Sequence, residues 1–125
     1  MSMQILTYAA SIILLGWGVA HLFPTRNIVR SFGEISADNK RIITMEWITE
    51  GVALVFIGFV VAATTYLDGT SIVSKVVYSS TVVVLCVLTV VSGFTGFRNS
   101  FIAFKLCPFV FIGSSILIIA GSLVD

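Results

Sequence analysis

The sequence predicts an all-α membrane protein: an antiparallel bundle of four transmembrane helices with a short amphipathic interfacial helix between the first two spans. Of the 125 residues, 58% are hydrophobic and only 10% are charged, a composition typical of integral membrane proteins. Four apolar runs each have the roughly 20 residues that a helix needs to cross a hydrocarbon core of about 30 Å. None of the runs alternates like a barrel strand, so helices must satisfy the backbone in lipid.

The spans use most of the chain and leave no room for a separate soluble domain, so we expect residues 1–125 to form one membrane domain. The expected helices are residues 5–23, 42–66, 72–94 and 101–124. Pro24 ends the first span, because proline pushes the preceding residue out of the helical region. The second and third connections are tight turns, which makes consecutive helices antiparallel neighbours.

The first connection, residues 25–40, is the only long one. Its apolar residues Ile28, Phe32 and Ile35 recur at helical spacing, while most of its charged residues fall on other faces. This pattern predicts a short amphipathic helix in the membrane interface. Asp38 then stands where the second span needs an N-cap.

The basic residues indicate the orientation in the membrane. Six of the seven Lys and Arg residues flank the first and third connections, and only Lys75 lies near the second. Short connections rich in Lys and Arg stay in the cytoplasm. We therefore expect a multi-pass protein of the plasma or inner membrane with both termini on the non-cytoplasmic side.

Two acids interrupt the second apolar run. Glu46 and Glu50 are one helical turn apart and share a face. Measured from Arg41 at the interface, they lie about 7 Å and about 13 Å deep. An ionised carboxylate at the bilayer centre costs at least ~2.5 kcal/mol, so such acids usually face the bundle interior and have a partner or a proton.

The other spans bring polar residues to the same side of the membrane. His21 ends the first span, Arg98 ends the third and Lys105 lies early in the fourth. We expect Glu46 to pair with Lys105 or Arg98, which leaves Glu50 less compensated and more readily protonated. Glu50, Glu46 and His21 are therefore the candidate catalytic residues. The alternative is that they only fasten helices together. A single histidine without metal-binding spacing predicts no metal site.

Aromatic residues gather on the same side of the membrane as the polar cluster. They are suited to forming a pocket for a flat lipophilic ligand next to the charged residues. The alternative is an aromatic belt at the interface combined with ordinary packing. The expected ligand-binding residues are Trp17, Trp47, Phe97, Arg98, Phe101 and Lys105.

Two stretches carry a resemblance to a known family. GWGVAHLFPTRNIVRSF at residues 16–32 and EWITEGVALVFIGFVV at residues 46–61 resemble the first and second helices of the DoxX-like family of small four-helix membrane proteins. On that match His21, Pro24, Glu50 and Gly51 take the family positions. The chain departs from the family in its extra acid at Glu46, its Phe-rich third turn and its lack of a redox-active cysteine pair. The resemblance implies an accessory or catalytic subunit of a membrane oxidoreductase system, linked in some relatives to quinone and thiosulfate or thiol chemistry.

Three functions follow as hypotheses. The first is a DoxX-like accessory subunit that packs against a partner membrane subunit or against itself and holds a quinone or similar ligand near Glu50 and Trp47. The second is a membrane-embedded enzyme of isomerase or cyclase type, with Glu50 as general acid, Glu46 as base or orienting group and His21 as proton relay. The third is an oligomeric proton-coupled transporter or channel. The lipid bilayer is the expected environment, and we expect no nucleic-acid partner.

Overall fold

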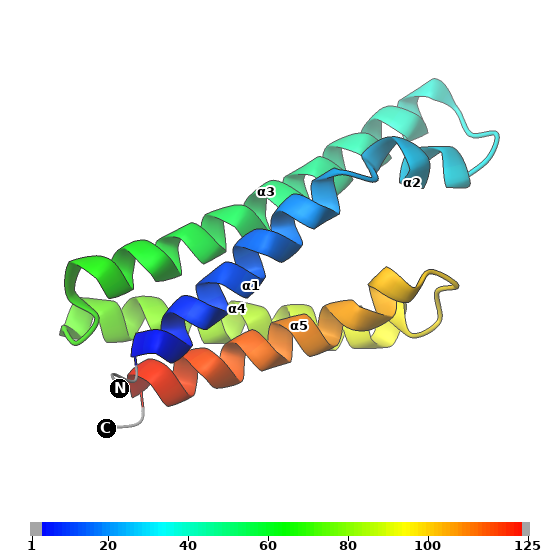
Figure 1. Cartoon of the computed structure of the whole chain (residues 1–125). Helices are drawn as coiled ribbons and strands as arrows, with labels where there is room; N and C mark the ends of the chain where they lie inside the picture. Colours follow the sequence, from blue (N-terminus) through cyan, green and yellow to red (C-terminus); the bar gives the residue numbers. More distant parts are fainter. Residues whose placement is uncertain (1–3, 124–125) are drawn as a thin grey trace.

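The computed structural model describes residues 4–123, and most of them are helical (Figure 1). Four helices are long and apolar enough to cross a membrane: α1, α3, α4, and α5 with the first turn of the π-helix that follows it. The all-α class is confirmed, and the length and composition of the four helices fit a multi-pass membrane protein. The end of the fourth expected span, Val124, lies outside the described residues. The elements are α1 Gln4–Leu22, α2 Thr25–Ser31, α3 Ala37–Asp68, α4 Ile72–Gly96, α5 Ile102–Ile118 and the π-helix η1 Ile119–Leu123.

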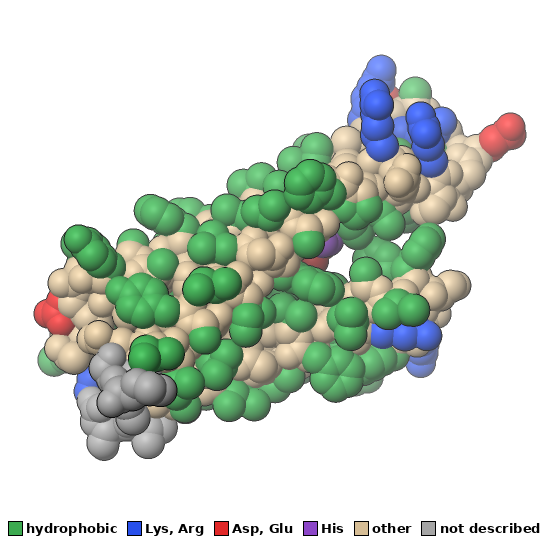
Figure 2. Space-filling view, in the orientation of Figure 1, with side chains coloured by type: hydrophobic (Ala, Val, Ile, Leu, Met, Phe, Trp, Pro, Cys, Tyr) green, Lys and Arg blue, Asp and Glu red, His purple; other side chains and the backbone are tan. Residues whose placement is uncertain are grey.

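The long helices form two pairs. α1 packs along α3, α4 packs along α5, and α1 also contacts α5 (Figure 1). The start of α1, the α3–α4 connection and η1 lie at one end of the molecule, whereas α2 and the α4–α5 connection lie at the other. The two pairs are close together at the first end and diverge toward the end that carries α2 (Figures 1 and 2). We call these the closed end and the open end.

Small residues bring α1 and α3 into close contact. Ser11 and Gly18 lie seven residues apart on α1, as do Gly51 and Gly58 on α3, and seven residues are about two helical turns. The Ser11 hydroxyl donates a hydrogen bond of 2.7 Å to the Gly58 carbonyl. A Cβ atom at Gly18 would lie 2.7 Å from the Val55 backbone nitrogen and 2.9 Å from the Gly51 carbonyl oxygen. Glycine is therefore required where the two backbones meet.

α4 and α5 come into close contact one helical turn before Pro108 of α5. α5 continues through Pro108, which has no N–H to donate to the Phe104 carbonyl one turn earlier. That carbonyl lies against Gly96 of α4, where an added Cβ would collide with the carbonyl oxygen. Gly96 thus provides space for a carbonyl group that has lost its usual helical donor.

The core is narrow, and most large apolar side chains point outward. Leu14, Leu54, Leu85 and Phe111 are at most 1% exposed, whereas hydrophobic side chains cover the long sides of the molecule (Figure 2). A surface of this kind requires lipid rather than water around it. The described structure thus supports a bilayer environment for the four spans.

α3 begins earlier than the hydropathy pattern predicts. It starts at Ala37 instead of residue 42, and Ser36 is its N-cap, accepting a hydrogen bond of 3.1 Å from the Asn39 backbone N–H. The prediction that Asp38 is the N-cap is wrong. Asp38 lies in the first turn, where its carboxylate is 3.0 Å from the Arg41 guanidinium. Hydropathy misses these turns because they are helical but polar.

Candidate functional site

A cavity of about 350 Å³ lies at the open end, among α1, α2, α3 and the start of α5. Figure 2 shows the molecule hollowed between the two helix pairs at this end. The walls are mainly aromatic and aliphatic. Trp17 and His21 come from α1, Trp47 from α3, and Phe101 and Phe104 from the beginning of α5. The divergence of the two helix pairs therefore creates an apolar cavity with a histidine in its wall.

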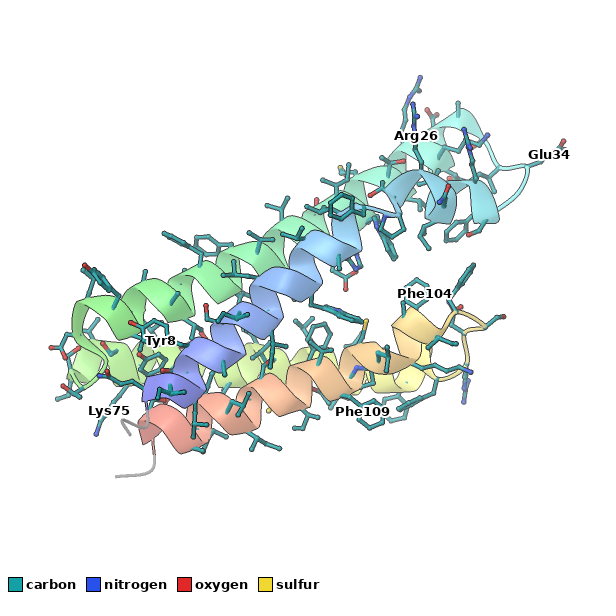
Figure 3. The ribbon with its side chains drawn as sticks, in the orientation of Figure 1. Tyr8, Arg26, Glu34, Lys75, Phe104 and Phe109 are labelled. Carbon is teal, nitrogen blue, oxygen red and sulfur yellow. The ribbon has the colours of Figure 1, made fainter. Side chains whose placement is uncertain are left out.

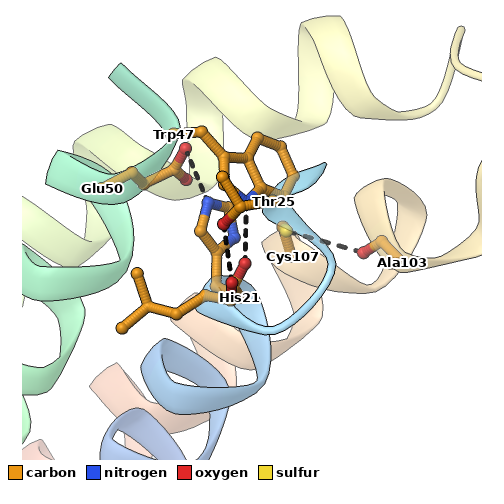
Figure 4. Close-up of polar contacts among 7 residues, drawn as sticks. His21, Thr25, Trp47, Glu50, Ala103 and Cys107 are labelled. Atoms are coloured by element: carbon orange, nitrogen blue, oxygen red, sulfur yellow. Dashed lines mark hydrogen bonds and ion pairs between the residues drawn. The ribbon is translucent and has the colours of Figure 1, made fainter. Parts of the chain in front are cut away.

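The His21 side chain is fixed by Trp47 (Figure 4). The two rings are stacked, with centroids 3.9 Å apart and planes 15° apart. The Trp47 indole N–H also donates a hydrogen bond of 2.7 Å to the His21 carbonyl oxygen. Phe104 contacts the same indole edge to face, with centroids 5.5 Å apart. Trp47 thereby links α3 to both α1 and α5 and sets the plane of the imidazole.

Glu50 is the acid that meets His21. Its Oε2 atom lies 3.5 Å from His21 Nε2. The Glu50 side chain is 47% exposed, whereas the His21 side chain is 6% exposed. An N–H···O hydrogen bond is usually 2.7–3.2 Å long, and among residues 4–123 Nε2 has no hydrogen-bond partner. A buried imidazole nitrogen thus faces a half-exposed carboxylate just beyond hydrogen-bonding distance.

Glu46 lies in a different place from the one predicted for it. It is exposed and lines a groove of about 420 Å³ together with Glu50 and Trp47, on the side of α3 that faces Leu88 of α4. The described helices contain no ion pair between Glu46 and either Lys105 or Arg98.

The predicted pairing of Glu46 is therefore not formed. Lys105 and Arg98 are exposed. The physical reason is the direction of the side chains: the start of α5 meets α3 through Phe104, which packs on Trp47, whereas Glu46 lines the groove beside Leu88. Glu50, which was expected to be the less compensated acid, is the one with a partner that can carry positive charge.

The predicted ligand-binding residues separate into two groups. Trp17, Trp47 and Phe101 line the cavity. Phe97 instead packs edge to face on Phe109, with centroids 5.9 Å apart. The remaining two residues, Arg98 and Lys105, are exposed and do not line the cavity.

Several residues that line the cavity were not among the predicted site residues, and two of them, Asn27 of α2 and Cys107 of α5, carry a polar or sulfur-containing side chain. Cys107 follows Phe104 by three residues and therefore shares its helix face, a signal that was present in the sequence. Asn27 carried no such signal, because its position depends on how the chain turns after α1 and packs α2 against α3.

A second buried nitrogen belongs to Trp17. Its indole N–H has no hydrogen-bond partner among the described residues, and Cys107 lines the same cavity. An indole N–H can only donate, and a thiol sulfur is a weak acceptor. Leaving a buried donor unsatisfied costs ~1–3 kcal/mol. Two residues of the cavity wall, Trp17 and His21, thus each have a buried ring nitrogen without a hydrogen-bond partner among the described residues.

The described residues contain no group of three or more His, Cys, Asp or Glu side chains that could hold a metal ion. Comparison of the chain with protein-family models, with curated proteins and with solved structures gave no match. The resemblance to the DoxX-like family remains a prediction.

Proposed function

We propose that this protein is an antiparallel four-helix membrane protein that binds a flat lipophilic ligand bearing oxygen acceptors, such as a quinone, in the cavity at its open end. The observation that carries the proposal is an apolar cavity with two buried nitrogens that lack hydrogen-bond partners, Trp17 Nε1 and His21 Nε2. An oxygen acceptor on the ligand would satisfy the Trp17 donor, which has no partner among the described residues.

The size and walls of the cavity support a small-molecule ligand. Its volume of about 350 Å³ falls in the range of about 300–1,000 Å³ that is usual for such sites, which are mostly apolar with a few well-placed polar groups. Trp17, Trp47 and Phe104 offer ring faces and edges against which a planar ring can pack. The ligand class therefore follows from the wall chemistry as well as from the two nitrogens.

The distribution of basic residues also favours one orientation of the protein in the membrane. We place α2 in the cytoplasmic interface and both termini on the non-cytoplasmic side, as the distribution of Lys and Arg favours. The cavity then lies in the cytoplasmic half of the bilayer. A ligand dissolved in that leaflet enters sideways between the diverging helix pairs. In line with the DoxX-like resemblance, the protein acts as an accessory subunit beside a partner membrane subunit.

Native mass spectrometry in mild detergent tests ligand binding. A short-chain benzoquinone is compared with an alkylbenzene of the same chain length, which fills the cavity but offers no oxygen. Wild-type protein is expected to prefer the quinone, and Trp17→Phe, which keeps a ring but removes the donor, to weaken quinone binding by about 2- to 10-fold, the value of one hydrogen bond of ~0.5–1.5 kcal/mol.

Phe97→Leu is the matched control, because Phe97 is an aromatic residue of the same end that does not line the cavity. It should leave quinone binding unchanged. Equal binding of the quinone and the alkylbenzene to wild-type protein would contradict the proposal, and so would an equal loss in the two variants.

A second candidate function, an acid–base enzyme on a lipophilic substrate, is favoured by the approach of His21 Nε2 to Glu50 Oε2 at 3.5 Å. His21 lines the cavity and Glu50 the groove beyond it, so a proton taken from a substrate carbon by the imidazole has an acceptor at the carboxylate.

The enzyme hypothesis is tested with a lipophilic β,γ-unsaturated ketone in D₂O. The expected product is the conjugated ketone carrying deuterium, and Glu50→Gln is expected to abolish its formation while Glu46→Gln retains it. Absence of deuterium uptake in wild-type protein, or equal rates in wild-type protein and Glu50→Gln, would reject this function.

A further inference from the structure

α2 has a second pocket on the side that faces α3. This pocket, of about 200 Å³, is lined by Thr25, Arg26, Val29, Arg30 and Thr44. It is separate from the ligand cavity, to which α2 contributes other residues. Figure 3 shows Arg26 at the open end of the molecule, and Figure 2 shows Lys and Arg side chains gathered there.

The two arginines of this pocket have no ion-pair partner among the described residues. Arg26 and Arg30 are one helical turn apart, so their side chains share a face of α2. Both are exposed, and neither forms an ion pair with an acid of the described chain. The nearby ion pair between Asp38 and Arg41 uses the acid at the start of α3. Within residues 4–123, the pocket therefore carries two positive charges that no ion pair neutralises.

The chemistry of the pocket suits a phosphate group. Guanidinium groups bind phosphate oxygens through paired, charge-assisted hydrogen bonds. The Thr25 and Thr44 hydroxyls already donate to the carbonyls of Leu22 and Lys40, so their oxygens remain available as acceptors. A phosphate with a hydroxylated substituent would use both features.

The surroundings of the pocket indicate a lipid rather than free phosphate. On α3, Ile48 and Val52 follow Thr44 at four-residue steps on the same face, and their exposed fractions are 43% and 54%. The 32 residues of α3 extend over about 48 Å, longer than a hydrocarbon core of about 30 Å. The polar start of α3 therefore projects beyond the hydrocarbon core. The apolar stripe formed by Ile48 and Val52 runs from the pocket toward the hydrocarbon core.

We propose that the pocket formed by Arg26, Arg30 and Thr44 binds the headgroup of an anionic phospholipid such as phosphatidylglycerol, with an acyl chain lying along Ile48 and Val52. The bound lipid fixes α2 against α3. Since the other side of α2 forms part of the wall of the ligand cavity, the lipid also stabilises that wall. The headgroup site itself does not depend on the function proposed for the cavity.

Native mass spectrometry of the full chain tests the site by titration with phosphatidylglycerol and phosphatidylcholine of identical acyl chains. Wild-type protein is expected to bind phosphatidylglycerol more tightly. Each basic residue near a charged lipid surface contributes ~1 kcal/mol, or about fivefold in affinity. The double variant Arg26→Gln/Arg30→Gln is therefore expected to lose about 25-fold in phosphatidylglycerol affinity and less for phosphatidylcholine, whose choline cation offsets the phosphate charge.

Arg98→Gln is the matched control, because Arg98 is an exposed basic residue at the same end of the molecule that does not line the pocket. It is expected to retain wild-type affinity. Equal affinities for the two lipids would overturn the proposal, as would an equal loss in the control, which would indicate diffuse surface attraction. Displacement of the lipid by inorganic phosphate at similar concentration would also overturn it and define a site for free anions.

Discussion

The contact between α1 and α3 can be tested with two glycines of the same helix. At Gly18 an added Cβ would lie 2.7 Å from the Val55 backbone nitrogen, whereas at Gly16 it would meet nothing within 4 Å. Ordinary van der Waals contact begins at 3.4 Å, so the Cβ atom of Gly18→Ala would be about 0.7 Å too close to the Val55 nitrogen. The obstacle is backbone, which cannot rotate away as a side chain can, so α3 must move.

The two substitutions differ only in this clash. Both replace glycine by alanine inside a helix and gain the same intrinsic propensity, about 1 kcal/mol. Gly18→Ala alone also incurs overpacking, which typically costs about 1–3 kcal/mol. The free energy of unfolding of Gly18→Ala is therefore expected to be about 1–3 kcal/mol below that of Gly16→Ala.

Unfolding by SDS in mixed micelles, followed by tryptophan fluorescence, measures this difference. Trp47 is a suitable reporter because its ring is stacked on His21, across the contact between α3 and α1. If the two variants unfold with free energies equal within about 0.5 kcal/mol, the usual error of such comparisons, the close approach of the two backbones is refuted.

Three other changes have expected outcomes. Tyr78→Phe removes the buried hydrogen bond of 2.8 Å between the Tyr78 and Thr65 hydroxyls and is expected to lower the free energy of unfolding by ~0.6 kcal/mol, the average for such bonds in membranes, measured by SDS titration. A lipid-soluble photoreactive probe is expected to label exposed Cys86 of α4 before buried Cys107 when labelling is followed by mass spectrometry, because the exposed side of α4 faces the bilayer. Ser36→Ala removes the N-cap of α3 at a cost of ~1 kcal/mol, seen as faster hydrogen exchange in the first turn of α3.

Each of these experiments has a control in the chain. Tyr66→Phe changes an exposed tyrosine and should leave unfolding unaffected. Asp38→Ala should accelerate exchange less than Ser36→Ala, because Asp38 is not the cap. Labelling of Cys107 ahead of Cys86 would contradict the described packing of α5 and would mean that the cavity is more open than its walls indicate.

Part of the site was predictable from the sequence. Trp17, Trp47 and Phe101 were expected to line a pocket with His21 near it, and the structure brings them to one cavity. Their selection rested on residue type and depth along each helix, which are local properties. Phe97 does not line this cavity and packs on Phe109 instead, because depth along a helix does not specify which face turns toward the cavity.

The sequence by itself determined the four long apolar helices, because hydropathy sums over neighbouring residues and does not depend on distant contacts. Only the tertiary structure decided that Glu50 meets His21 and that Glu46 meets neither Arg98 nor Lys105. Those partners depend on the direction of the side chains where the helices meet at the open end. That direction is a property of packing between segments remote in sequence, and the charges of the residues do not encode it.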